Sequence, residues 1–247
     1  MNKLLFLYLT FLVFTGHGFS QQAFTFDLFT AQIQDSKLVV KNNDGKTVLE
    51  MMFNNPHDYT VDLDGDSVDE YIVIDSTGSR NLPFYTIYIF NTIDEFALAD
   101  SIQSGITQPY DMFSNEEGGE IIVTGNKDFE FFDQADSDIF LPVNCWKYDS
   151  GQIYLVNDSI YELFIQENEE IIDYLDTYYE SGSYECKTAH HIQSAIAAAY
   201  ANYVNAGEVT LASQFLKKYY PCDDVNTFLK NINDLLNQGD GNENGME

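Results

Sequence analysis

Five carboxylate side chains lie between positions 62 and 70, within the segment YTVDLDGDSVDEYIVID of residues 59–75. Like charges this close together repel one another when a loop folds tightly. Hard cations such as Ca²⁺ bind about six to eight oxygen ligands, and acids at alternate positions of a tight turn can point towards one ion. The segment therefore predicts a divalent-cation site, and the alternative is an acidic surface turn that binds no metal.

Counted from Asp62, the loop has acids at positions 1, 3, 5 and 9, and residue 7 can offer its main-chain carbonyl. Gly65 gives the turn conformational freedom. An EF-hand loop has Gly at position 6 and Glu at position 12 before a helix, but here those positions hold Ser67 and Val73 and a strand follows. The candidate metal ligands are Asp62, Asp64, Asp66, Val68 through its carbonyl, and Glu70.

The run DLDGDSVDE followed by YIVI resembles the calcium loop of FG-GAP and VCBS repeats, the blade units of integrin-type β-propellers. The resemblance covers residues 59–75 and implies a β-hairpin that binds Ca²⁺ through the five ligands named above. It also implies a mostly structural role for the ion, with folding linked to metal binding. Ser67 stands where that family commonly has glycine, which would weaken the turn without removing a ligand.

A degenerate echo of this loop follows at residues 111–125, in DMFSNEEGGEIIVTG. Its acids Asp111, Glu116 and Glu117 do not keep the spacing of the first loop, so we expect a second blade-like unit that binds no metal. Two or three such units are too few to close a propeller of about six or seven blades. The resemblance therefore implies an open or partial arrangement of blades.

Strands must position these loops, and residues 21–160 are predicted to form an antiparallel all-β domain. Short segments rich in Ile, Val, Tyr and Phe alternate there with Gly, Asn and Asp. The run Asn43-Asp44-Gly45 predicts a hairpin turn, because Asp and Gly tolerate positive φ. The segment YDSGQIY at residues 148–154 predicts another hairpin.

The hydrophobic period changes near residue 160, which predicts a C-terminal helical bundle over residues 161–238. Apolar residues at helical spacing mark a helix in the first part of this segment. Three further helices are predicted at about residues 188–204, 208–220 and 223–237. The expected fold class is therefore α+β, and the polar, glycine-rich end at 239–247 is expected to be disordered.

The chain has three cysteines, Cys145, Cys186 and Cys222. Two antiparallel helices joined by a short turn bring their outer ends together, which places Cys186 beside Cys222 and predicts a disulfide between them. The bond would close a loop of roughly 37 residues, worth ~3–4 kcal/mol in the chain-entropy model. Cys145 is then expected to be buried and unpaired, and the alternative is three free buried thiols.

Residues 1–20 hold one lysine, an apolar run and small residues before position 21, which is the layout of a cleaved secretory signal peptide. The alternative is a membrane anchor, for which the apolar run is short. Cleavage of this segment would remove Lys3 and no acidic residue, so the net charge of the chain would change from −29 to −30. Such a charge disfavours nucleic acids and anionic membranes as partners. Because of the signal-like segment we expect a secreted or periplasmic protein, and we expect its partner to be an extracellular protein or glycan.

The sequence contains no recognisable motif for a catalytic nucleophile, a phosphate loop or a catalytic metal, so no catalytic residue is assigned. His190 and His191 are adjacent, and adjacent residues of a helix do not form a two-ligand face. The first hypothesis is a calcium-binding module that serves binding or adhesion. The alternative is an exported hydrolase with a carboxylate-based site. The 40 acidic residues form too many possible pairs for the sequence to single one out.

Overall fold

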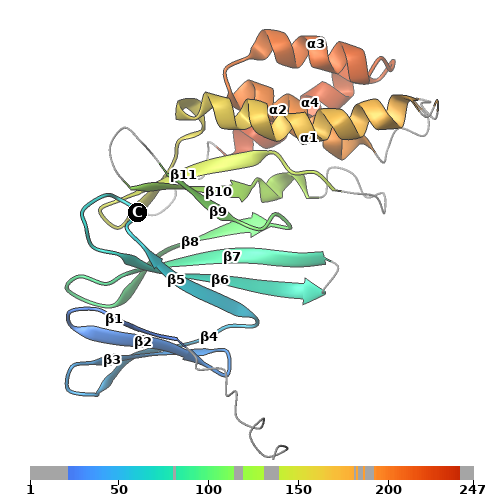
Figure 1. Cartoon of the computed structure of the whole chain (residues 1–247). Helices are drawn as coiled ribbons and strands as arrows, with labels where there is room; N and C mark the ends of the chain where they lie inside the picture. Colours follow the sequence, from blue (N-terminus) through green and yellow to red (C-terminus); the bar gives the residue numbers. More distant parts are fainter. Residues whose placement is uncertain are drawn as a thin grey trace, which may run out of the picture. The chain divides into compact units, whose positions relative to one another are not determined.

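The computed structural model describes residues 22–79, 82–113, 119–130, 139–180, 182, 186 and 192–239. In these residues the chain forms three antiparallel sheets of four strands, none of them closed, and four helices towards the C-terminal end (Figure 1). The predicted α+β fold with open β units is confirmed. The described residues form two compact units, one up to Phe53 and the other from Asn54 onwards. The signal segment predicted at residues 1–20 lies outside the described residues.

The first unit is a meander of four strands, in the order β1-β2-β3-β4. Its strands are β1 (Ala23–Thr25), β2 (Phe29–Gln34), β3 (Lys37–Asn42) and β4 (Thr47–Met52). The turn between β3 and β4 contains Gly45 with a φ of 77°. The side chain of Asn42 accepts hydrogen bonds from the main-chain N–H groups of Asp44 and Lys46. The hairpin predicted from Asn43-Asp44-Gly45 is therefore confirmed.

The second unit contains the other two sheets. The first sheet of this unit has the order β5-β6-β7-β8. The other, called the second sheet below, has the order β12-β11-β10-β9. Ser150 and Gly151 both have positive φ in the turn between β11 and β12, which confirms the second predicted hairpin. The strands are β5 (Pro56–Val61), β6 (Glu70–Ser79), β7 (Leu82–Asn91), β8 (Ala97–Gly105), β9 (Tyr110–Phe113), β10 (Glu120–Gly125), β11 (Val143–Asp149) and β12 (Gln152–Leu155).

Four helices complete the second unit: α1 (Tyr161–Glu180), α2 (Gln193–Asn205), α3 (Val209–Tyr219) and α4 (Val225–Gly239). The alanine-rich α2 is the most buried of them, since every residue from Ser194 to Asn202 is buried. Within the described helices, no stretch is both long enough and apolar enough to cross a membrane. His190, His191 and residues 240–247 lie outside the described residues.

The second unit is layered, and β10 lies in the middle of it. Its Ile122 packs in the core between the two sheets, together with Leu63 and Ile72. Its Ile121 points the other way and packs against Phe164 of α1. Alternate residues of β10 therefore face the β5–β8 sheet on one side and the helices on the other, as the two-residue period of a strand requires. Figure 1 shows the four helices together on one side of the sheet that contains β10 and β11.

The predicted disulfide between Cys186 and Cys222 is present, with Cα atoms 5.7 Å apart. It joins the segment before α2 to the third residue after the end of α3, as the antiparallel packing of these helices requires. Cys145 is free and fully buried on β11, which confirms the expectation of one unpaired thiol. Burial, and then the charge of Glu167, raises the pKa of this thiol to about 12, so it is not a reactive group.

Two buried asparagines join the helices to the second sheet. Asn202 of α2 accepts a hydrogen bond from the main-chain N–H of Val143 at 3.0 Å and donates one to the side chain of Asn168 at 3.0 Å. Asn168 of α1 donates in turn to the carbonyl of Ala199 at 3.1 Å. Both side chains are almost completely buried, so the hydrogen bonds of the network replace those that water would make.

Replacement of Asn202 with alanine is expected to lower the free energy of unfolding by ~2–3 kcal/mol, because a buried N–H and a buried carbonyl lose their partners. Denaturant unfolding measures the change. Asn231→Ala, at an exposed position of α4, is the matched control and should change stability by less than ~0.5 kcal/mol. Equal effects of the two variants would contradict the role given to the network.

Candidate metal site

The acidic loop connects β5 to β6, and its two ends are fixed by the ladder that pairs Val61 with Glu70. Three of the predicted ligands come together at this hairpin end. Carboxylate oxygens of Asp62, Asp64 and Glu70 all lie within 4.8 Å of one another, which is a spacing that can hold a metal ion. Asp62 and Asp64 are partly exposed and Glu70 is buried.

Hydrogen bonds within the loop orient its carboxylates. Asp62 accepts from the main-chain N–H of Gly65 at 2.8 Å with one oxygen and from that of Ser67 at 3.0 Å with the other. Asp64 accepts from the N–H of Asp66 at 3.2 Å. An ionised carboxylate has about four acceptor positions, so these bonds leave lone pairs available for a cation.

Glu70 is the member of the group that most needs a positive partner, since its exposed fraction is only 3%. One carboxylate oxygen accepts the main-chain N–H of Leu63 at 2.9 Å. Burial, opposed by the hydrogen bond from Leu63 and aided by the charges of Asp64 and Asp66, raises the pKa of Glu70 to about 7. A cation at the group would offset both the burial and the repulsion.

The second sheet supports the acidic loop from the side. The main-chain N–H of Glu120, at the start of β10, donates to the carbonyl of Leu63 at 3.0 Å. Leu63 is thus bonded through its N–H to Glu70 of its own hairpin and through its carbonyl to the next hairpin. Gly119 has a φ of 79°, and a Cβ at this position would lie 2.3 Å from the Leu63 carbonyl oxygen. Only glycine lets the two hairpins approach this closely.

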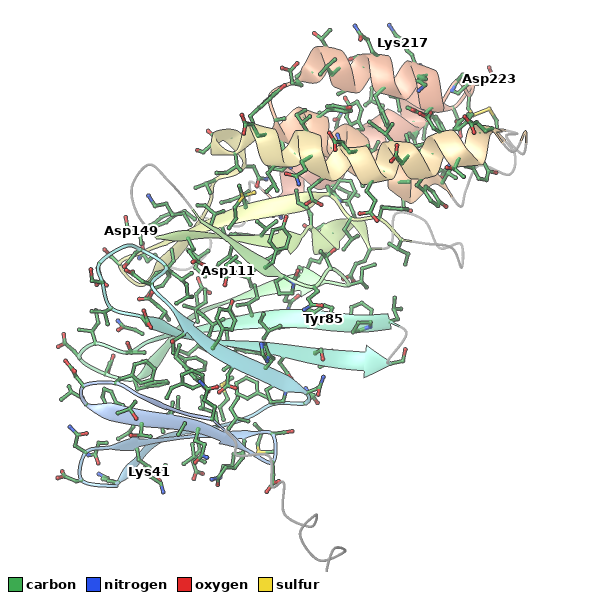
Figure 2. The ribbon with its side chains drawn as sticks, viewed as in Figure 1. Lys41, Tyr85, Asp111, Asp149, Lys217 and Asp223 are labelled. Carbon is green, nitrogen blue, oxygen red and sulfur yellow. A yellow bond between two sulfur atoms is a disulfide. The ribbon has the colours of Figure 1, made fainter. Side chains whose placement is uncertain are left out.

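The predicted echo forms the hairpin β9–β10, where Phe113 pairs with Glu120 as Val61 pairs with Glu70. Asp111, labelled in Figure 2, accepts a hydrogen bond from the hydroxyl of Tyr59. Burial raises the pKa of Asp111, and burial followed by the charges of Asp111 and Asp62 raises that of Glu120. Asp62, Asp111 and Glu120 therefore belong to one acidic region.

Two acids of the echo, Glu116 and Glu117, lie outside the described residues. Two ligands predicted for the first loop are not among the three grouped carboxylates. Asp66 is exposed and accepts the N–H of Val68 at 2.7 Å, and the side chain of Val68 is also exposed. Both remain predicted ligands, Asp66 through its carboxylate and Val68 through its carbonyl.

Ser67 adopts a φ of 74°, a conformation that favours glycine. Ser67→Gly is therefore expected to raise the free energy of unfolding by about 0.5–1 kcal/mol, after allowance for the greater freedom of glycine in the unfolded chain. Chemical denaturation measures the gain. Ser101→Gly in β8, where φ is negative, should instead lower stability, and a loss in both variants would contradict the proposed strain at Ser67.

Reasoning from the sequence did not identify Leu63, Gly119 or the amide of Glu120 as parts of the site. The pair Gly118-Gly119 was the available signal, since a glycine before a strand can mark a close approach of two backbones. Nothing in the sequence indicates which backbone would approach it, because the partner lies more than fifty residues earlier in the chain.

No family model matches the chain, and comparisons with curated proteins and with solved structures likewise find no match.

Proposed function

We propose that this chain is an exported protein that binds Ca²⁺ at the Asp62–Glu70 loop, uses the ion to stabilise its β structure, and serves as a module that binds an extracellular protein or glycan. The observation that carries the proposal is the buried carboxylate of Glu70 beside Asp62 and Asp64. Several like charges converge there in a loop that the second sheet holds in place.

The chemistry of the ligands favours calcium over other metals. The grouped side chains offer only carboxylate oxygens, which suit Ca²⁺ and Mg²⁺, and the group includes neither histidine nor cysteine. Asp66 and the carbonyl of Val68 would raise the number of oxygen ligands towards that of Ca²⁺. Mg²⁺ keeps several of its waters and is seldom enclosed by a protein loop of this kind.

A structural role for the ion follows from its position. The loop is bonded to β6 through Glu70 and to β10 through Glu120, so an ion bound there would join the two sheets of the second unit.

Export is supported by the disulfide Cys186–Cys222 and by the signal-like pattern of residues 1–20. Disulfides persist in oxidising compartments, and Ca²⁺ sites of extracellular modules commonly have Kd values of ~10⁻⁴–10⁻³ M. The net charge of −29 disfavours polyanions as partners and suits a basic or neutral extracellular ligand.

Terbium luminescence tests the metal site directly, because Tb³⁺ takes oxygen ligands as Ca²⁺ does and is sensitised by a nearby tyrosine. Tyr148 is close enough to Glu70, Asp64 and Asp66 for their charges to contribute, after burial, to a pKa of about 12. Excitation of tyrosine should produce terbium emission that Ca²⁺ suppresses and that Asp64→Ala loses. Emission that persists unchanged in Asp64→Ala would contradict the site.

A further inference from the structure

A second feature of the molecule, remote from the acidic loop, is a cavity of about 320 Å³ between the second sheet and the helices α2 and α4. Its volume falls at the lower end of the ~300–1,000 Å³ range of ligand pockets. Six of its lining residues are asparagines, the last two of them from α4: Asn126, Asn144, Asn157, Asn205, Asn233 and Asn237.

The composition of this asparagine pocket differs from that of the rest of the chain. Among the described residues no charged side chain lines it, although the chain has 40 acidic and 11 basic residues. The remaining lining residues are Leu155, Val204 and Leu236, which are aliphatic. The pocket is therefore neutral, rich in amides, and apolar on part of its wall.

Main-chain groups fix how several of these amides are oriented. Asn157 accepts the N–H of Cys145 at 2.7 Å, so its NH₂ group is the one that donates to Asn144, at 3.2 Å. The oxygen of Asn144 is thereby occupied, and its own NH₂ group is left without a partner among the described residues. Asn126 is 7% exposed and its side-chain oxygen accepts the N–H of Asp128 at 3.1 Å. The NH₂ group of Asn126 also has no partner among the described residues.

The helices contribute further unused hydrogen-bonding groups. Asn205, at the end of α2, donates to the carbonyl of Val143 at 3.5 Å, and its oxygen has no donor among the described residues. Asn233 and Asn237 lie one turn apart on α4, and neither amide has a hydrogen-bond partner in the described part of the chain. The pocket thus presents hydrogen-bond donors and acceptors together.

This set of groups matches a neutral ligand with many hydroxyls. An amide offers a donor and an acceptor side by side, and so does a pair of neighbouring hydroxyl groups. The aliphatic side chains suit the C–H surface of a sugar ring. A charged ligand would find no opposite charge in the pocket, and an anion would also be repelled by a chain with a net charge of −29.

We propose that the asparagine pocket binds a neutral saccharide unit. The inference rests on the binding role proposed above and specifies a glycan as the ligand. It does not depend on the acidic loop. The amides of Asn126 and Asn144 donate to sugar hydroxyls, the oxygen of Asn205 accepts from one, and Asn233 and Asn237 close the pocket from the side of α4.

Saturation-transfer NMR on the full protein tests this, with D-glucose, D-galactose, D-mannose and N-acetyl-D-glucosamine as separate probes at 10 mM. At least one probe should receive saturation from the wild-type protein. The double variant Asn233→Ala/Asn237→Ala should weaken the binding of that probe at least tenfold. Both side chains lack hydrogen bonds in the described structure, so the variant should fold, and circular dichroism checks that it does.

Asn231→Ala is the matched control, because it removes the same group from an exposed position of α4 that does not line the pocket. It should bind the probe as the wild type does. No transfer to any of the four sugars, or equal binding by the control and the double variant, would overturn the proposal. So would binding of glucuronate or acetamide in preference to the neutral sugars.

The two proposed sites fail separately. A wild-type protein that binds sugar but gives no terbium emission would contradict the calcium site alone. Terbium emission without sugar binding would contradict the asparagine pocket alone.

Discussion

Gly119→Ala is expected to lower the free energy of unfolding by at least ~4 kcal/mol and to abolish the stabilisation by Ca²⁺. The added Cβ would lie 2.3 Å from the carbonyl oxygen of Leu63 and 3.0 Å from the carbonyl carbon of Asp64, and both atoms belong to the backbone of the acidic loop. A backbone cannot move aside as a flexible side chain can. The loop must therefore shift away from β10, which breaks the bond from Glu120 and disturbs the carboxylate group.

The matched control is Gly151→Ala in the turn between β11 and β12. Gly151 has a φ of 86°, close to the 79° of Gly119, but a Cβ there would have no atom within 4 Å. The control therefore carries the conformational cost alone, which is ~1–2 kcal/mol, and should keep its response to Ca²⁺. Urea denaturation of both variants with and without CaCl₂ measures the difference. Equal costs in the two variants would contradict the close packing of the hairpins.

Glu70→Gln is expected to have opposite effects in the absence and presence of Ca²⁺. Folding raises the pKa of Glu70 to about 7, which means that the folded state favours the protonated carboxyl. At pH 8 this carboxyl is mostly ionised, and its charge then lowers the stability of the folded protein. Without a cation, the neutral glutamine should therefore raise stability by about 2–3 kcal/mol. With 10 mM Ca²⁺ the wild type should gain about 1.4–2.7 kcal/mol and the variant nothing, if Kd is ~10⁻⁴–10⁻³ M.

Asp69→Asn provides the control for the second prediction, since it removes one charge from the same loop at an exposed position outside the carboxylate group. It should retain the response to Ca²⁺. Differential scanning calorimetry at pH 8 in EDTA and in CaCl₂ distinguishes the three proteins. A Glu70→Gln variant that is less stable than the wild type in EDTA, or that gains as much from Ca²⁺, would contradict the role of Glu70.

The elements that depend on local chemistry could be predicted from the sequence. The turns at Asn43–Gly45 and Ser150–Gly151 carry residues that tolerate positive φ, and both hairpins are present. The disulfide also followed from local reasoning, because a short turn between α2 and α3 brings Cys186 and Cys222 together. The change of period near residue 160 marks the start of α1 at Tyr161.

The features that depend on packing between distant segments could not be predicted. The spacing of the acids indicated a cation loop, but the burial of Glu70 follows from how the two sheets of the second unit stack. The contact of Gly119 with Leu63 has the same origin. The asparagine pocket draws on segments from residue 126 to residue 237, and no single stretch of sequence contains its pattern.

The measurement that tests the calcium site most directly is the thermal unfolding of the purified protein in EDTA and then in increasing CaCl₂, with Asp64→Ala in parallel. The midpoint of the wild type should rise by about 3–10 °C at 10 mM Ca²⁺, and that of Asp64→Ala should not change. A wild-type midpoint that stays constant up to 10 mM Ca²⁺ would contradict the site, and the five carboxylates would then form an acidic surface turn.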